Sequence, residues 1–400
     1  MCGLPTDGRR GFGVATRLAT VEAAVEPTMR ETMRVCMVSH RSGGFDGVAT
    51  MGSQWSSAFT ELGWRVTHVA GRFDQPVDPG SDVALDSLWA PVFGGRPPEP
   101  DRERIDTLVR THDLLVLDNI GSYPSAVLAA IAFEESALRH GVPTIVRHHD
   151  PTWQVTAWRA LVPESFPLHN PRMLHLTVNK LTESQFRTRY PELAFHDAVS
   201  TAYSRVSRRL NNAGDRAATR AQLGVDPDDI LLSHPARNID RKNIPAALKL
   251  ARNLSALTTR RIHYWLTSPE GALPDAPGVH LHRGNVDDAA DLYAASDFIV
   301  LTSFWEGWGL PVVEAAAAGK LVATYPYPVL GELHDLGITT IDCRDAKRVM
   351  DLINDSAEYR KVAESNQKAA RQLDVSHLTG CLAHHAARAN HLMLGTMICV

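Results

Sequence analysis

The sequence predicts an α/β protein with two domains, each a doubly wound parallel sheet with helices on both faces. From residue 35 onward, apolar strand segments alternate with helical segments, which is the pattern of a parallel sheet buried on both sides. The alternation stops in the polar, arginine-rich stretch 203–225 and then restarts. The 400 residues also exceed the about 250–300 at which a single core stops growing. We therefore expect an extension at 1–33, domains at 34–205 and 215–380, and a closing helix at 381–400.

In the first domain, five apolar segments have the length and composition of buried strands. They are 35–40, 65–70, 114–117, 144–147 and 173–178. A helix is expected from about Thr50 and ends at Gly63, because glycine readily adopts the left-handed conformation that follows a helix. A second helix is expected at 124–140 and ends at Gly141 for the same reason.

The second domain repeats this alternation. Its expected strands are 230–234, 297–302 and 321–324. The helix expected at 244–257 has Pro245 in its first turn, where a missing N–H is tolerated. Another helix begins at Pro311 and ends at Gly319. The two halves share this order of elements but no sequence repeat.

Composition and charge exclude several classes of protein. Apolar residues make up 44% and charged residues 22%, a balance typical of globular proteins. The net charge of −4 gives no basic excess, so we do not expect a nucleic-acid partner. No apolar run approaches the roughly 18 residues that span a bilayer, and none follows Arg9 and Arg10, so neither a membrane protein nor a secretory signal is expected. The five scattered cysteines favour a reducing compartment, and we expect a cytoplasmic protein.

Two glutamates lie eight positions apart across a predicted strand–loop–helix junction, in the run S-F-W-E-G-W-G-L-P-V-V-E. Glu306 stands in a loop whose Gly307 and Gly309 allow another group to approach the backbone closely. Glu314 lies one turn into the helix. The N–H groups at the helix start, including that of Leu310, point out of the carboxyl edge of the sheet and can donate to phosphate or sugar oxygens.

This run resembles the E-x7-E signature of retaining glycosyltransferases with the GT-B architecture, in particular glycosyltransferase family 4. The resemblance implies two Rossmann-like domains that face each other across a cleft. It also implies that Glu306 lies beside the hexose of a nucleotide-sugar donor and that Glu314 binds the ribose. The alternative is a solvated loop glutamate and an ordinary first-turn helix carboxylate. The other donor-binding residues of this segment would be Gly307, Trp308, Gly309 and Leu310.

A second segment, H-P-A-R-N-I-D-R-K-N, follows the first strand of the second domain and resembles the G-R-x(n)-K-[GN] motif of the same family. Ala236 stands where glycine is usual. The resemblance implies that Arg237 and Lys242 bind the donor diphosphate, and a phosphoryl leaving group does need cations where negative charge develops. The alternative interpretation is a solvated cationic loop. It is the weaker interpretation, because the segment is expected at the same sheet edge as the two glutamates.

Two features of the first domain resemble the family more loosely. Gly43 and Gly44 stand in the turn after the first strand, which resembles a glycine-rich loop at the interdomain cleft and is assigned to donor binding. His149 ends a strand and precedes an aspartate, as in the strand-terminal H-D whose histidine contacts the donor sugar. A glycine-rich turn often only joins a strand to a helix, and a strand-end histidine is often structural. The candidate catalytic residues are His149, Arg237, Lys242 and Glu306.

No metal ion or cofactor is expected. Asp226 and Asp228 spell D-x-D, a metal motif of a different glycosyltransferase fold, but they flank Pro227 before a strand, which is ordinary turn chemistry. The eighteen histidines show no ligand spacing. The turn S-G-G-F-D-G after the first strand also lacks the nicotinamide-binding pattern G-x-G-x-x-G.

These features predict a retaining, metal-independent glycosyltransferase that moves a hexose from a UDP- or GDP-sugar to a small soluble acceptor. We favour an acceptor of specialised metabolism, because no lipid anchor or basic amphipathic stretch points to a membrane acceptor. The resemblance implies front-face displacement, in which the departing phosphate oxygen takes the acceptor proton. No His–Asp pairing marks His40 or Asp46 as the base of an inverting enzyme. A nucleotide-sugar epimerase and a non-catalytic sugar-nucleotide-binding protein stay open as alternatives, as does the oligomeric state.

Overall fold

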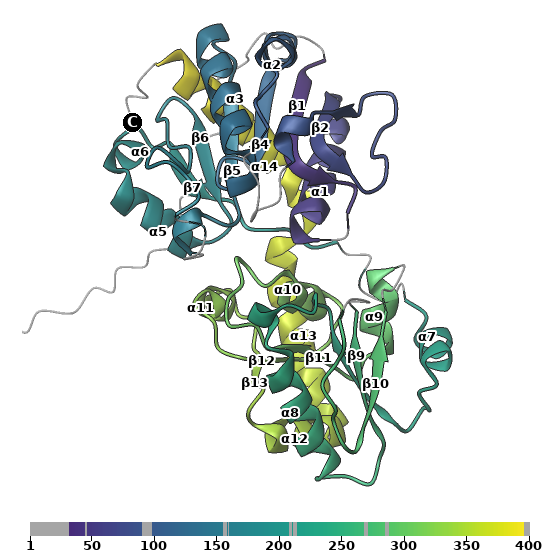
Figure 1. Cartoon of the computed structure of the whole chain (residues 1–400). Helices are drawn as coiled ribbons and strands as arrows, with labels where there is room; N and C mark the ends of the chain where they lie inside the picture. Colours follow the sequence, from purple (N-terminus) through teal and green to yellow (C-terminus); the bar gives the residue numbers. More distant parts are fainter. Residues whose placement is uncertain are drawn as a thin grey trace, which may run out of the picture.

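The computed structural model describes residues 32–44, 46–89, 98–154, 158, 160–207, 210, 214–267, 271–284 and 288–395. They form two α/β units, drawn one above the other in Figure 1. Each unit has one sheet, and the strand pairs in both sheets are parallel. The predicted α/β class with two parallel-sheet domains is therefore confirmed. Nearly all of the extension expected at 1–33 lies outside the described residues.

The first unit has seven strands in the order β3-β2-β1-β4-β5-β6-β7. The strands are β1 (Arg34–Ser42), β2 (Arg65–Phe73), β3 (Val83–Ala84), β4 (Leu114–Asp118), β5 (Thr144–His148), β6 (Leu174–Thr177) and β7 (Val199–Thr201). The helices are α1 (Gly47–Glu61), α2 (Arg102–Arg110), α3 (Val127–His140), α5 (Lys180–Arg189) and α6 (Pro191–Phe195), with short 3-10 turns at Asp86–Leu88, Pro124–Ala126 and Thr152–Gln154. The strand order reverses direction between β1 and β4, and open α/β sheets bind ligands at the carboxyl edge of such a point.

Local capping sets the helix boundaries of this unit. α1 begins at Gly47, earlier than expected, because the Asp46 side chain accepts two backbone N–H groups of the first turn. The helix expected at 124–140 opens with the 3-10 turn Pro124–Ala126, and α3 follows it. α3 ends at Gly141, which adopts a left-handed φ of 67°.

The second unit has six strands in the order β10-β9-β8-β11-β12-β13. The strands are β8 (Ile230–His234), β9 (Ile262–Leu266), β10 (Val279–Arg283), β11 (Phe298–Leu301), β12 (Val322–Thr324) and β13 (Ile341–Asp342). The helices are α7 (Arg216–Leu223), α8 (Ile244–Ser255), α9 (Ala289–Ala295), α10 (Leu310–Ala317), α11 (Leu330–Asp335), α12 (Ala346–Asn354) and α13 (Ser356–Ala370), with 3-10 turns at Asp240–Lys242, Arg371–Leu373 and Val375–His377. Here the order reverses between β8 and β11, which brings the loops after these two strands together.

The last helix, α14 (Leu378–Leu394), returns to the first unit, where Figure 1 draws it in yellow. Its apolar side joins the cluster between α1 and the first sheet. Arg388 of this helix also donates to the Ser200 hydroxyl of β7 at 2.9 Å. The chain passes from the first unit to the second near Val206 and returns near Asp374. These two connecting segments lie side by side, because Val206 and Asp374 form an isolated parallel bridge.

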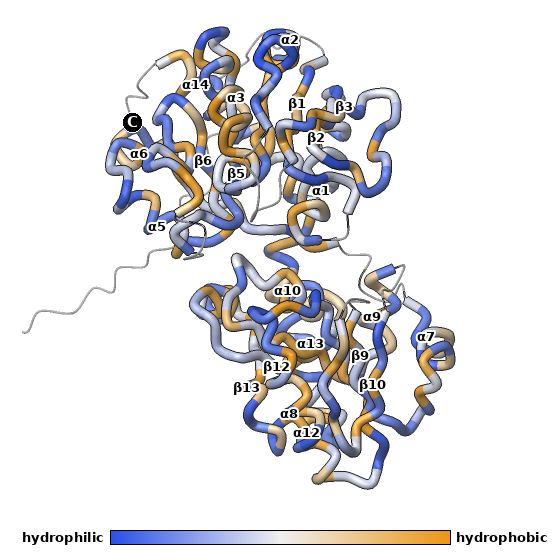
Figure 2. The backbone as a smooth tube through the Cα atoms, in the orientation of Figure 1, coloured by the Kyte–Doolittle hydropathy of each residue, from blue (hydrophilic) through white to orange (hydrophobic). Residues whose placement is uncertain are grey.

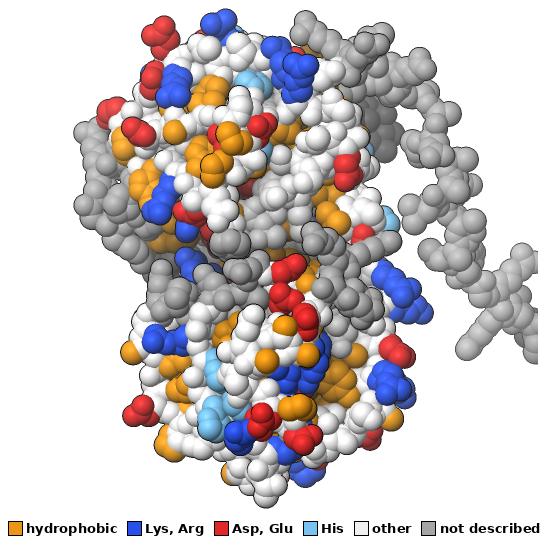
Figure 3. Space-filling model, turned by 90° about the vertical axis from the view of Figure 1, so that its right-hand side faces the viewer, with side chains coloured by type: hydrophobic (Ala, Val, Ile, Leu, Met, Phe, Trp, Pro, Cys, Tyr) orange, Lys and Arg blue, Asp and Glu red, His pale blue; other side chains and the backbone are white. Residues whose placement is uncertain are grey.

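Apolar residues are concentrated inside both units. Figure 2 shows hydrophobic segments along the strands in the middle of each unit, with more hydrophilic segments such as α2 on the outside. Apolar clusters lie on both faces of the first sheet and on both faces of the second. On the face shown in Figure 3, Lys and Arg side chains are interspersed with Asp and Glu. No helix in the described part of the chain is both long and apolar enough to cross a membrane.

Candidate active site

Glu306 and Lys242 form a buried ion pair at the carboxyl edge of the second sheet. Lys242 lies in the loop after β8, and Glu306 lies in the loop after the neighbouring strand β11. Lys242 Nζ is 2.5 Å from Glu306 Oε1, and Arg241 Nη1 is 3.2 Å from Oε2. Burial by itself would raise the pKa of Glu306, but the charges of Lys242 and Arg241 outweigh it and lower that pKa. Glu306 is therefore an ionised carboxylate at neutral pH, held between two cations.

Arg237 lies in the same loop as Lys242 and is exposed. Burial is the main cause that lowers the pKa of Lys242, and the charge of Arg237 adds to it. Burial likewise raises the pKa of Tyr123 in the first unit, and the charge of Arg237 opposes that shift. Arg237 is thus near both groups. Among the described residues it has no carboxylate partner, which leaves its guanidinium available to an anion between the two units.

Glu314 lies one turn into α10 with a single side-chain partner in the described structure. The Tyr293 hydroxyl donates to Glu314 Oε2 at 2.6 Å. Burial raises the pKa of Glu314 to about 7, and the hydrogen bond from Tyr293 works in the opposite direction. The other carboxyl oxygen, Oε1, has no hydrogen-bond partner among the described side chains.

The start of α10 is an open helix N-terminus. Gly309 precedes it with a φ of 91°, and a side chain there would collide with the Tyr327 hydroxyl. No described side chain caps the helix, so the N–H groups that begin at Leu310 can donate to an anion. Trp308 is placed differently, because its ring is buried and stacks on Tyr203 with the centroids 4.5 Å apart. Its side chain belongs to the core, which leaves only its backbone for a ligand.

His149 faces this loop from the first unit. Its Nε2 is 3.0 Å from Asp118 Oδ1, and its backbone N–H donates to Asn119 Oδ1 at 3.1 Å. Burial would raise the pKa of Asp118, but Arg147, at 2.9 Å, and His149 outweigh it and lower that pKa. Gly307 lies against His149, since a Cβ at this glycine would be 3.1 Å from the His149 carbonyl oxygen. The fold therefore brings His149 and the Glu306 loop together across the two units.

Polar contacts join the two units beside the site. Asn179 Nδ2 donates to the Gly307 carbonyl at 2.5 Å, while its Oδ1 accepts a backbone N–H of α5. Glu332 of α11 accepts the backbone N–H groups of Lys180 and Leu181 at 2.8 and 3.0 Å, and so also caps α5. These contacts hold the Glu306 loop to the first unit.

Gly43 and Gly44 line an open hollow of about 460 Å³ in the first unit. Gly43 has a φ of 70°, and a side chain there would collide with the Gln75 backbone. At Gly44, a Cβ would lie 2.7 Å from Asp74 Oδ2. All lining residues of the hollow come from the first unit. Gly43 and Gly44 therefore belong to the first unit's part of the site and are not among the residues around Glu306.

The two side chains considered as an inverting base have other partners. The His40 ring nitrogen Nδ1 is 3.0 Å from the Leu88 carbonyl oxygen, and the ring stacks on Trp89. Burial lowers the pKa of His40. Asp46 is occupied as the cap of α1. Within the described residues, neither side chain belongs to a His–Asp pair.

The D-x-D segment lies away from the site. Asp226 precedes β8, at the amino edge of the sheet, and pairs with Arg261. Throughout the described part of the chain, no group of three or more His, Cys, Asp or Glu side chains is placed to hold a metal ion.

Four side chains of the site were not expected from the sequence. Arg241 has a clear signal, because it stands beside Lys242 in the same motif. Asp118 ends β4 beside β5, which makes it a neighbour of His149 once the strand order is known. Asn179 is a common helix-capping residue just before α5, although its bond to the other unit has no local signal. Nothing in the sequence points to Tyr293.

Known proteins resemble this chain in sequence and in fold. Residues 278–373, which include Glu306 and Glu314, match the family described as glycosyl transferases group 1. The chain is 22% identical to mannosylglucosylglycerate synthase of Thermotoga maritima, over 85% of this chain and 96% of that protein. Its fold resembles HepE of Anabaena in complex with UDP-glucose, with a TM-score of 0.62, 16% identity, and coverage of 89% of this chain and 99% of that one. A glycosyltransferase from Rickettsia africae gives a TM-score of 0.66 at 12% identity, with coverage of 90% and 99%. The two facing Rossmann-like domains, the matched segment and these relatives together support a glycosyltransferase with the GT-B architecture.

Proposed function

We propose that the protein is a retaining glycosyltransferase, similar to glycosyltransferase family 4, that moves a hexose from a nucleotide-diphosphate sugar to a small soluble acceptor. One observation carries the proposal. The two loops at the carboxyl edge of the second sheet bring Arg241 and Lys242 against Glu306, and His149 faces this pair of loops from the first unit. Glu314 follows in the first turns of α10, directly after the second loop. The residues of this edge are Arg237, Arg241, Lys242, Glu306 and Glu314.

The donor diphosphate binds to Arg237, Lys242 and the open start of α10. Lys242 is paired with Glu306, and Arg241 is the second cation on that carboxylate. Arg241 can therefore keep Glu306 paired when Lys242 turns to the diphosphate. Glu306 then accepts hydrogen bonds from the hexose hydroxyls, and Glu314 accepts them from the ribose.

Transfer proceeds on one face of the sugar. The acceptor oxygen bonds to the anomeric carbon while the bond from that carbon to the phosphate oxygen breaks, and the acceptor proton goes to the departing phosphate oxygen. Arg237 and Lys242 stabilise the charge that develops there, in place of a metal ion. Asp118 holds Nε2 of His149, which leaves Nδ1 for a hexose hydroxyl. Closure of the two units excludes water and suppresses donor hydrolysis.

The named relatives support the substrate classes. HepE was solved in complex with UDP-glucose, which supports a UDP-hexose as donor; a GDP-hexose is the second donor to be tested. The Thermotoga relative is named as a mannosylglucosylglycerate synthase, and because such a glycoside is a small molecule, this name supports a small acceptor. No observation favours the epimerase, and the complete set of cations and carboxylates argues against a non-catalytic protein.

A thermal-shift screen of UDP-, GDP- and ADP-sugars tests the proposal. A donor at one hundred times its Kd stabilises the protein by about 2.7 kcal/mol. The double variant Arg237→Ala, Lys242→Ala is the control, and its stabilisation by the same donor should be clearly smaller. Stabilisation by no nucleotide sugar, or an equal shift in the double variant, would contradict the proposed site. Conversion of a donor to its epimer without acceptor would favour the epimerase instead.

A further inference from the structure

A buried arginine lies two residues before His149. Arg147 belongs to β5, which is buried along its whole length, and only 4% of the residue is exposed. Ile145 shares its face of the strand and packs in the apolar cluster between α1 and the sheet. A charge at such a position is unfavourable unless it is paired, and replacing a buried ion pair by apolar side chains is often neutral or stabilising. Stability alone therefore does not explain an arginine here.

The partner of Arg147 is the carboxylate that holds His149. Arg147 Nη1 is 2.9 Å from Asp118 Oδ2, and the other oxygen, Oδ1, is 3.0 Å from His149 Nε2. Burial by itself would raise the pKa of Asp118, but the charge of Arg147 and the bond to His149 outweigh it and lower that pKa. An ionised carboxylate only accepts hydrogen bonds, so Nε2 carries the ring proton and Nδ1 keeps a lone pair.

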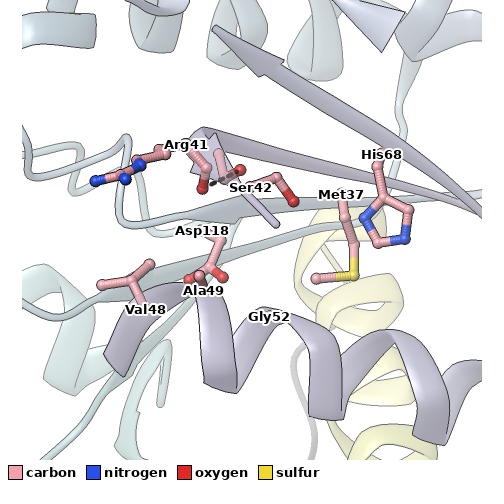
Figure 4. A pocket seen from close by; sticks show the side chains of 9 residues that line it. Met37, Arg41, Ser42, Val48, Ala49, Gly52, His68 and Asp118 are labelled. Carbon is pink, nitrogen blue, oxygen red and sulfur yellow. Dashed lines mark hydrogen bonds between the residues drawn. The ribbon is translucent and has the colours of Figure 1, made fainter. Parts of the chain in front are cut away.

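Contacts on the side of α1 hold this arrangement. The Arg147 guanidinium lies over the Trp55 ring, 4.1 Å from its centroid, and Trp55 also stacks with His385 of α14. Gly52 of α1 leaves room for the carboxylate, because a Cβ there would be 3.3 Å from Asp118 Oδ2. Figure 4 shows the Asp118 side chain pointing from its strand toward α1. Both charged groups are buried, so the charge of Arg147 acts on Asp118 with little screening.

The other ionisable groups nearby do not replace Arg147. Among the described residues, Arg147 and His149 are the ionisable groups that shift the pKa of Asp118. Burial lowers the pKa of each neighbouring histidine, so these side chains are neutral at pH 7; they are His68 of β2, His148 of β5 and His385 of α14. The charged side chains nearby have partners of their own, namely Arg41 with Asp74, Asp150 with Asn119, and Glu306 with Lys242 and Arg241.

We propose that Arg147 is a positioning residue for the transfer: by keeping Asp118 ionised, it fixes the ring proton of His149 on Nε2 and leaves Nδ1 to accept a hydroxyl of the donor hexose. This inference rests on the proposed glycosyltransferase function. Without the charge of Arg147, burial raises the pKa of Asp118, and the Asp118–His149 pair takes up a further proton at a higher pH. That proton goes either to Nδ1 or to Asp118, which then donates to Nε2 while the ring proton sits on Nδ1. In both arrangements Nδ1 carries a proton and no longer accepts the hydroxyl.

Arg147→Gln and Arg147→Lys separate charge from hydrogen bonding. Glutamine keeps an N–H donor but removes the charge, whereas lysine keeps the charge. Calorimetry over a range of pH gives the ratio of the Kd of UDP to that of UDP-glucose, and GDP with GDP-mannose is the second pair. This ratio reports the contacts of the hexose, because the ribose contact of Glu314 is common to both ligands. The ratio should decline at a pH about one unit or more higher in Arg147→Gln than in wild type, and close to the wild-type pH in Arg147→Lys.

Nitrogen NMR of histidine-labelled protein reads the ring protons of His149 without any ligand, and His149→Gln assigns its signals. Nδ1 should gain its proton at a pH about one unit or more higher in Arg147→Gln than in wild type. Arg220→Gln is the matched control. Arg220 is also 4% exposed and pairs with a carboxylate, Asp297, in the second unit, so this variant should leave both readouts at their wild-type pH.

The double variant Arg147→Met, Asp118→Asn covers the case in which Arg147→Gln does not fold, because it removes both buried charges together. Asparagine can turn either its oxygen or its NH₂ group to Nε2, so it no longer fixes the tautomer of His149. NMR should show both tautomers, and the ratio of the two Kd values should fall about threefold or more at every pH, as expected for the loss of one hydrogen bond.

A decline at the same pH in wild type and Arg147→Gln, or the same single tautomer of His149 in the double variant, would overturn the inference. Nucleotide binding is measured in the same samples and separates the two ideas. If no nucleotide sugar binds, the proposed function fails, and the NMR titration alone decides whether Arg147 controls the proton of His149. If nucleotide sugars bind but the variants behave as wild type, only the inference about Arg147 fails.

Discussion

The raised pKa of Glu314 should make donor binding depend on pH. Burial raises the pKa of this carboxyl to about 7. Ribose hydroxyls donate their hydrogen bonds to a carboxylate, so tight binding requires the ionised form of Glu314. Donor affinity is therefore expected to rise as the pH increases through 7.

The size of the expected change in the donor Kd follows from the ionised fraction of Glu314. If only the ionised form binds, the apparent Kd equals the intrinsic Kd divided by that fraction. With a pKa of about 7, the ionised fraction is about one tenth at pH 6 and about nine tenths at pH 8. The Kd should fall about tenfold over this interval, which corresponds to about 1.4 kcal/mol of binding free energy.

Isothermal titration calorimetry with one nucleotide sugar at pH 6, 7 and 8 measures this dependence in wild type and in Glu314→Gln. The amide does not titrate, so the variant should bind more weakly at pH 8 and with nearly the same Kd at each pH. A flat wild-type profile, or an equal slope in the variant, would refute the assignment of Glu314 to the ribose.

Folding stability provides the control for this variant. Burial raises the pKa of Glu314 in the folded protein above its value in the unfolded chain, so the free energy of unfolding of the wild type falls as the pH rises toward 7. The loss is about 1.4 kcal/mol for each pH unit that separates the two pKa values. Glu314→Gln lacks this loss and should be at least as stable above pH 7, so weaker binding cannot be attributed to unfolding.

The remaining predictions concern the diphosphate, the metal and the donor loop. Arg237→Ala and Lys242→Ala should each lower kcat about 100-fold and weaken nucleoside binding much less, because their charge acts mainly on the leaving group; wild-type rates would exclude them from the diphosphate site. Activity should survive EDTA, and loss on chelation that Mn²⁺ restores would show instead that a metal ion is required. Gly309→Ala should lower the free energy of unfolding by more than about 1 kcal/mol and abolish donor binding, since it adds a collision with Tyr327 to a strained φ. Gly63→Ala has a similar positive φ with no neighbour within 4 Å and serves as the control; an equal loss in both variants would refute the steric argument.

Strong local patterns account for the strands predicted from the sequence. β4, with the sequence L-L-V-L-D, is buried along its whole length and reads as a continuous apolar run. Elements without such a run were not expected. β3 has only two residues, and β10, with the sequence V-H-L-H-R, lies at the edge of its sheet with mostly exposed side chains. An edge strand need not be apolar on both faces, so its sequence lacks the continuous apolar run from which a buried strand can be predicted.

In the candidate site, too, some features follow from local sequence motifs and others depend on the fold. Glu306, Glu314, Arg237 and Lys242 could be named because each lies in a short motif next to a strand end. The pairing of Lys242 with Glu306 depends on the order of β8 and β11, which is not local information. The sequence also places Trp308 in the donor loop without showing where its ring points, and the packing against Tyr203 decides that direction.

The stereochemistry of transfer tests the central claim most directly. The account requires that the acceptor attack from the face on which the phosphate departs, with no side chain acting as a base on the opposite face. An α-linked UDP- or GDP-hexose of gluco configuration should therefore give an α-linked product, identified by the small coupling constant of its anomeric proton in NMR. A β-linked product would show inversion and contradict the assignment.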